Sequence, residues 1–207
     1  MKQNNYLQQV SDNETTEILK QLASVISDGV KGDVVEFGCY RGDTSLLLQR
    51  VLTRDFADCE KNLWIYDSFE GLPARSAEDA SVAGDAFSAG ELFVTKREVV
   101  ERFKKAGLRV PRVRKGFFAD LDSSAESTDL PGEICFAFLD GDLYSSIKTS
   151  FELVTPRLVP GGIIIVHDYN NPQLPGSARA VDEWLRAHPD FQLERKETLA
   201  IIHWNGL

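Results

Sequence analysis

The chain has 207 residues, of which 43% are hydrophobic and 27% are charged, and its formal net charge at pH 7 is −9. This length and composition predict a single globular domain over residues 1–207. The acidic balance argues against a nucleic-acid binder, and no apolar run is long enough to span a membrane. The three cysteines show neither metal-ligand nor disulfide spacing, and the N-terminus is polar, which favours a cytoplasmic protein.

Hydrophobic periodicity divides the chain into alternating helices and strands. A loose polar arm is expected over residues 1–13, and together with the next helix it forms an N-terminal unit over 1–31. Helices are predicted over 14–27, 44–52, 95–106, 145–158 and 178–187, and strands over 34–38, 63–66, 113–118, 134–139, 163–166, 191–195 and 199–204. Asp43 or Thr44 is placed to cap the second helix. Pro160-Gly161-Gly162 is expected to stop the fourth.

The strand pattern predicts the fold class. The central apolar runs are continuous rather than alternating, which indicates a parallel sheet with helices on both faces. The last two strands have no helix between them, so they form an antiparallel hairpin. We therefore predict an α/β fold with a Rossmann-like, doubly wound, mostly parallel sheet and a C-terminal antiparallel hairpin, as in class I methyltransferases. The long aperiodic stretch over 73–90 is predicted to be a lid.

An acidic residue and two glycines follow the first predicted strand, in the stretch Glu36-Phe37-Gly38-Cys39-Tyr40-Arg41-Gly42. Glycine lets a ligand approach the backbone closely, and the next helix points free N–H groups at the same place. The spacing E-x-G-x-x-x-G departs from the dinucleotide fingerprint and is the pattern of class I S-adenosylmethionine methyltransferases. An ordinary strand-to-helix turn can contain the same residues.

Acidic residues recur at or near the ends of four predicted strands, as Glu36, Asp67, Asp140 and Asp168. In open α/β sheets, ligands bind outside the carboxyl ends of the strands, so these acids predict a site at that edge. Asp67 suits the two hydroxyls of a ribose, although an aspartate there also caps turns. The stretch 115–118 follows the third strand, where an adenine would lie. Its aromatic residues can stack on a base or belong to the core.

Two of these acids, Asp140 and Asp168, are expected to face one another across adjacent strand ends, with His167 beside them. Two oxygen ligands and a third polar group suit a divalent ion such as Mg²⁺, which keeps some of its waters. Such an ion would lower the pKa of a substrate hydroxyl. The competing interpretation is that these acids only cap helices and bind loop amides.

Six segments in order along the chain resemble the macrocin O-methyltransferase (TylF-like) family of sugar O-methyltransferases. They are GDVVEFGCYRGDTS at 32–45, YDSFEGLP at 66–73, KGFFADL at 115–121, LDGDLYSS at 139–146, LVPGGIIIVHDY at 158–169 and PGSARAVDEW at 175–184. The resemblance implies S-adenosylmethionine as methyl donor, dependence on a divalent metal, and transfer to a hydroxyl of a small molecule. In the family this acceptor is often a deoxysugar of a natural product.

The resemblance also implies roles for individual residues. Glu36, Gly38 and Gly42 would bind the methionine part of the cofactor, and Asp67 would bind its ribose. Asp140 would be a metal ligand and the catalytic base. The full predicted cofactor site is Glu36, Gly38, Cys39, Tyr40, Gly42, Thr44, Asp67, Ser68, Gly116 and Phe117, and the predicted metal ligands are Asp140, His167 and Asp168.

Two features depart from the family pattern. His167 stands beside Asp168 where the family usually has two adjacent acids, and imidazole suits a softer ion than Mg²⁺. The N-terminal segment is short for a family in which it helps to close the site and makes dimer contacts, so a homodimer is left open. The alternative function is a non-catalytic cofactor-binding protein on the same fold. A nicotinamide-dependent oxidoreductase is disfavoured by the glycine spacing, and the sequence does not identify the acceptor.

Overall fold

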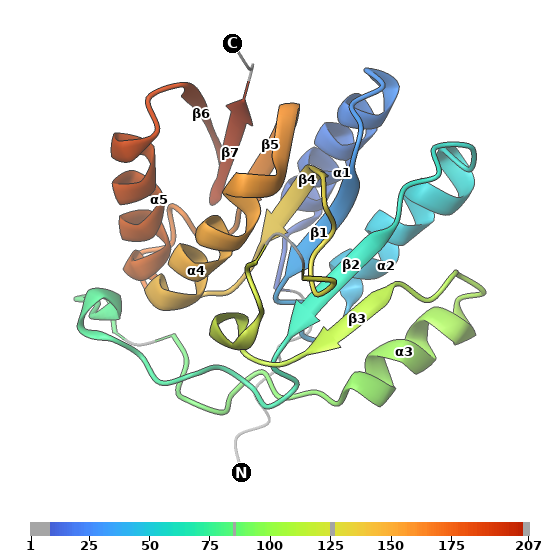
Figure 1. Cartoon of the computed structure of the whole chain (residues 1–207). Coiled ribbons are helices and arrows are strands. Elements are labelled where there is room, and N and C mark those ends of the chain that lie inside the picture. The colour runs from blue at the N-terminus through green and yellow to red at the C-terminus, as the bar shows by residue number, and fades with distance from the viewer. Residues whose placement is uncertain (1–8, 85, 125–126, 205–207) are drawn as a thin grey trace.

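A computed structural model describes residues 9–84, 86–124 and 127–204. Its strands are β1 (Asp33–Phe37), β2 (Leu63–Asp67), β3 (Arg112–Lys115), β4 (Ile134–Leu139), β5 (Leu158–Val166), β6 (Phe191–Lys196) and β7 (Leu199–Trp204). Within these residues, seven strands form one sheet in the order β3-β2-β1-β4-β5-β7-β6 (Figure 1). The first five are parallel, and β7 is antiparallel to both its neighbours. The predicted parallel sheet with a C-terminal hairpin is confirmed.

Helices cover both faces of the sheet (Figure 1). They are α1 (Asp12–Ser27), α2 (Asp43–Arg50), α3 (Lys96–Lys105), α4 (Tyr144–Val154) and α5 (Pro175–Ala187). Along β1, Val34 packs in the core layer shared with α1, α2 and α3, whereas Val35 and Phe37 pack in the layer shared with α4 and α5. Both faces of the strand are therefore buried, which explains its continuous apolar run. No helix in the described part of the chain is long and apolar enough to cross a membrane.

The predicted N-terminal arm was too long. Residues 1–8 of it lie outside the described residues, but α1 begins at Asp12 rather than at Glu14. The reason is a capping box. The Ser11 hydroxyl accepts a hydrogen bond from the Glu14 N–H, and the Glu14 carboxylate accepts one from the Ser11 N–H. The sequence signal S-x-x-E was present at this position and marks the start of the helix.

The predicted fourth helix also had the wrong C-terminal end. α4 ends at Val154, and a 3₁₀ turn spans Thr155–Arg157. Pro156 contributes to this end, because proline lacks the N–H that would continue the helical hydrogen bonds. The segment 160–162, expected to be the stop signal, lies inside β5.

Three further boundaries differ from the prediction. β3 ends at Lys115, and residues 118–120 form a 3₁₀ turn instead of continuing the strand. α2 begins after Gly42, which has a φ of 77°, and no side chain of the described residues caps this helix. Asp43, one of the two expected caps, pairs instead with Arg102 of α3. α5 begins three residues early, at its proline, because proline fits the first turn of a helix.

The segment 73–90 is not wholly irregular, because it contains a 3₁₀ turn at Ala77–Asp79. Asp79 is 1% exposed. Its Oδ1 atom accepts a hydrogen bond from the Tyr144 N–H at 2.7 Å, and its Oδ2 atom accepts from the Ser76 N–H at 2.9 Å. A Cβ atom added to Gly176, in the first turn of α5, would lie 1.9 Å from Oδ1. Asp79 therefore pins the segment between the first turns of α4 and α5.

We predict that Asp79→Asn lowers the free energy of unfolding by about 1–3 kcal/mol, because the amide group would face N–H donors that the carboxylate now satisfies. Glu78→Gln is the matched control, since it removes the same charge from an exposed neighbour. It should change stability by less than about 0.5 kcal/mol. Urea denaturation measures both variants, and equal effects would contradict the anchoring role of Asp79.

Candidate functional site

A cavity of about 440 Å³ lies at the carboxyl ends of the parallel strands. Its wall is formed by the segments that follow β1, β2, β3 and β4, as expected for an open α/β sheet. The residues predicted for the cofactor that line it are Glu36, Gly38, Cys39, Tyr40, Thr44, Asp67, Ser68 and Phe117. Among the described residues of that predicted set, Gly42 and Gly116 are not part of the wall. The roles of all these residues stay predictions.

Glu36 presents a buried carboxyl group to this cavity. The residue is 1% exposed, and its Oε2 atom has no hydrogen-bond partner among the described residues. Burial raises the pKa of Glu36 to about 8, and the negative charges of Asp140 and Asp67 act in the same direction. An unpartnered carboxyl oxygen in such a place suits a cationic group of a ligand, which would both bind the oxygen and stabilise its charge.

Asp67 holds the turn that follows β1. Its Oδ2 atom accepts hydrogen bonds from the N–H groups of Cys39 at 2.9 Å and Tyr40 at 3.1 Å, and its Oδ1 atom accepts from the Phe69 N–H at 2.8 Å. These bonds stabilise Tyr40 in the left-handed region, at a φ of 43°. The bond from Phe69 is the turn cap that the sequence left open for Asp67, whereas no sequence pattern indicated its bonds to the turn after β1. The two bonds to Oδ2 use both of its lone pairs, whereas Oδ1 keeps one, so the carboxylate can still accept a bond from a ribose hydroxyl.

Gly38 is required by the protein's own backbone. Its φ is 87°, and a Cβ atom added there would lie 2.0 Å from the carbonyl oxygen of Asp140. The turns after β1 and β4 therefore approach one another more closely than any side chain at position 38 allows. The prediction attributed this glycine to the approach of a ligand, and the structure supplies a second reason for it.

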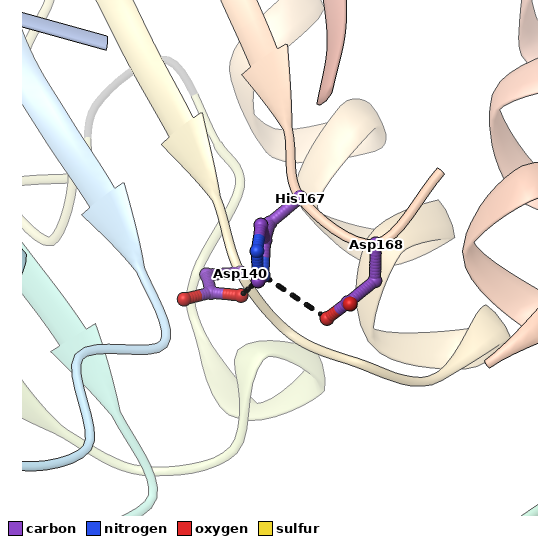
Figure 2. A group of neighbouring side chains, drawn as sticks. All are labelled: Asp140, His167 and Asp168. Carbon is purple, nitrogen blue, oxygen red and sulfur yellow. Dashed lines mark hydrogen bonds and ion pairs between the residues drawn. The ribbon is translucent and has the colours of Figure 1, made fainter. Parts of the chain in front are cut away.

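Asp140, His167 and Asp168 meet at the ends of β4 and β5, as predicted (Figure 2). The Nδ1 atom of His167 lies 2.8 Å from Oδ1 of Asp140 and 3.0 Å from Oδ2 of Asp168. One potential ligand atom from each residue lies within 4.8 Å of the other two. Asp140 lines the cavity, whereas His167 and Asp168 are more deeply buried behind it. The three predicted metal ligands are therefore close together beside the cavity, and their role as an ion site stays a prediction.

A third carboxylate, that of Glu14 in α1, faces the other ring nitrogen of His167. Its Oε2 atom lies 3.7 Å from Nε2. Burial by itself lowers the pKa of His167, but the carboxylates of Asp140, Asp168 and Glu14 outweigh it and raise this pKa well above its usual value. Without another cation in the group, the ring is therefore charged and compensates the acids around it.

Other residues of the cavity wall were not part of the predicted site. The N-terminal end of α1 contributes Asp12 and Thr15, and the preceding segment contributes Val10. Asp142 lies two residues after Asp140 and also lines the cavity. Burial raises the pKa of Asp142 well above its usual value, and the charge of Asp140 adds to this shift. The pattern D-G-D after β4 could have indicated Asp142.

Residues 10–202 match the sequence profile of the family described as macrocin O-methyltransferase (TylF). The chain belongs to this family. One relative is the 8-demethyl-8-(2,3-dimethoxy-α-L-rhamnosyl)-tetracenomycin-C 4′-O-methyltransferase of Streptomyces olivaceus, to which the chain is 37% identical over 151 residues. The aligned region covers 70% of this chain and 56% of that protein. The chain is also 33% identical over 168 residues to the demethyldecarbamoylnovobiocin O-methyltransferase of Streptomyces niveus, and this aligned region covers 77% of this chain and 60% of that relative. The chain thus spans less than two thirds of the length of these two relatives.

Solved structures confirm the fold of this macrocin O-methyltransferase family member. The O-methyltransferase NovP superposes with a TM-score of 0.75 at 27% identity, over 92% of this chain and 78% of NovP. The calicheamicin methyltransferase CalS11 superposes with a TM-score of 0.72 at 22% identity, over 95% of this chain and 82% of CalS11. The sheet is therefore that of class I methyltransferases, as predicted.

Gly38→Ala should destabilise this protein more than Gly29→Ala. Gly29 also has a positive φ, of 69°, but a Cβ atom added there meets no atom of the described residues within 4 Å. Its variant should lose about 1–2 kcal/mol from backbone conformation alone. Gly38→Ala should lose about 1–3 kcal/mol more, because its methyl group overlaps the Asp140 carbonyl. Chemical denaturation measures the difference, and equal losses would show that the two turns separate freely.

Proposed function

We propose that this member of the macrocin O-methyltransferase family transfers a methyl group from S-adenosylmethionine to a hydroxyl of a sugar or glycosylated natural product. The observation that carries the proposal is the buried, unpartnered Oε2 atom of Glu36 at the wall of the strand-end cavity. The relatives support the acceptor class, because one is named for 4′-O-methylation of a rhamnosylated tetracenomycin. Another is named as mycinamicin III 3″-O-methyltransferase.

The residues of the cavity fit this cofactor. Its volume of about 440 Å³ lies in the range of about 300–1,000 Å³ typical of small-molecule sites. Glu36 would bind the ammonium group of the methionine part, and Asp67 and Ser68 would bind the ribose hydroxyls. Phe117 would contact the adenine. S-adenosylmethionine supplies an already activated methyl group, so the chain itself must orient the acceptor oxygen and exclude water.

Asp140, His167 and Asp168 would hold a divalent ion. Two carboxylate oxygens and an imidazole nitrogen fit an ion of the Mn²⁺ to Zn²⁺ series better than Mg²⁺. When bound, the ion would lower the pKa of the acceptor hydroxyl. Of the three residues, Asp140 is the one that lines the cavity, and we assign to it the acceptance of the hydroxyl proton.

The segment 73–90 is proposed as the lid over the acceptor. Leu72 and Pro73, at its start, line the cavity, and so does Leu92 just beyond its end. Asp79 anchors one point of the segment to α4 and α5. The parts on either side of this anchor would close over the bound acceptor and exclude water from it.

Binding of S-adenosylmethionine should release about one proton at pH 6.5, because Glu36 has a pKa of about 8 in the free protein and must ionise to pair with the ammonium group. Affinity should therefore rise with pH below 8. Glu36→Gln should bind more weakly and release no proton. Calorimetry in buffers of different ionisation enthalpy measures the number released. The same proton release from wild type and Glu36→Gln would exclude Glu36 as the cation-binding group.

Methyl transfer to a panel of glycosylated acceptors tests the proposed function directly. EDTA should abolish turnover while leaving S-adenosylmethionine binding nearly intact. Asp140→Asn should lower kcat by about 10²-fold or more, because it removes a proton acceptor and an anionic ligand. Asp58→Asn, at an exposed position, is the control and should be fully active. Full activity in EDTA would refute the requirement for a divalent ion, and absence of cofactor binding would refute the proposed function as a whole.

A further inference from the structure

The imidazole ring of His167 is contacted on both sides by carboxylates from different parts of the chain. On one side, Nδ1 lies 2.8 Å from Asp140 and 3.0 Å from Asp168. On the other side, Nε2 lies 3.7 Å from Oε2 of Glu14, which is an ion-pair distance. His167 and Glu14 are each 5% exposed, so water screens this contact little.

Glu14 is more buried than its role at the start of α1 requires. Glu98 occupies the equivalent position in α3, where it forms a capping box with Thr95, and it is exposed. A buried carboxylate is costly unless it is paired. The capping function therefore explains the hydrogen bond of Glu14 to Ser11, but it does not explain why Glu14 points into the protein beside His167.

Further hydrogen bonds fix the Glu14 carboxylate in place. Its Oε1 atom accepts from the Thr198 N–H at 3.2 Å and from the Thr198 hydroxyl, in the turn between β6 and β7. Its Oε2 atom accepts from the Ser11 N–H at 2.9 Å. Both oxygens are held by the backbone, so the carboxylate presents a fixed negative charge to Nε2 of His167.

We propose that Glu14 is a positioning residue that sets His167 as an imidazole ligand of the divalent-ion site. A ring nitrogen that binds an ion must present its lone pair, so the ring proton must lie on the other nitrogen. The Glu14 carboxylate favours a proton on Nε2, which leaves Nδ1 directed toward Asp140 and Asp168. Carboxylates that contact the far nitrogen of a metal-binding histidine orient the ring and raise its basicity.

This inference rests on the ion site of the proposed function and adds to it a preference among divalent ions. A correctly oriented imidazole favours Mn²⁺, Co²⁺ or Zn²⁺ over Mg²⁺, because Mg²⁺ prefers oxygen ligands. Loss of Glu14 should therefore weaken the binding of the first group of ions, while the binding of Mg²⁺ through Asp140 and Asp168 should change little.

The test is Glu14→Gln in the full chain, with Glu98→Gln as the matched control. Glutamine can replace glutamate in a capping box, so both variants should keep their helix starts. Glu14→Gln should weaken Mn²⁺ binding about tenfold, the lower end of the effect known for such contacts. It should also change the absorption spectrum of bound Co²⁺. Glu98→Gln should do neither, and wild-type affinity and spectrum for Glu14→Gln would overturn the proposal.

A double-mutant cycle with His167→Asn separates positioning from a general effect on the fold. Asparagine keeps a polar atom near the place of Nδ1 but is too short to reach Glu14. In this background, Glu14→Gln should cause no further loss of Mn²⁺ affinity. An equal loss in both backgrounds would overturn the proposal while leaving the ion site intact. A wild-type chain that binds no divalent ion would overturn the site and this inference together, and cofactor binding would still report on the methyltransferase function.

Discussion

The rest of the structure depends on one electrostatic constraint, which is that several carboxyl groups lie close together at one buried edge of the sheet. Like charges so close together raise the energy of the fold unless each is compensated. Three different forms of compensation are present. Backbone N–H groups surround Asp67, and the His167 ring compensates the acids around it. The Oε2 atom of Glu36 has no hydrogen-bond partner among the described residues, and this carboxyl group holds its proton instead. A positively charged group bound at this edge would therefore lower its electrostatic energy.

Helix α1 connects this edge to the far end of the chain. Its first turn forms part of the cavity wall, and Glu14 binds both the Thr198 turn and the ring of His167. The helix therefore does more than cover one face of the sheet. The same turn lines the cavity and contacts the proposed ion ligand. A change in the position of α1 would therefore alter the proposed cofactor region and the proposed ion site together.

The sequence by itself determined the sheet and the edge at which the site lies. Apolar runs such as those of β4 and β5 must be buried on both faces, which requires a parallel sheet between two layers of helices. Polar residues that end such runs must then meet at the carboxyl edge. For this reason Asp140, His167 and Asp168 could be placed together from their positions alone, and the structure confirms their meeting.

Only the tertiary structure decided which further groups complete the site. Glu14 carries a capping signal that predicts a helix start, but its contact with His167 depends on how α1 packs against the sheet. The clash that forbids a side chain at Gly38 likewise arises between two turns that are distant in sequence. Hydrophobic periodicity encodes which face of an element is buried, whereas the partners of a buried polar group are set by long-range packing, which no local pattern records.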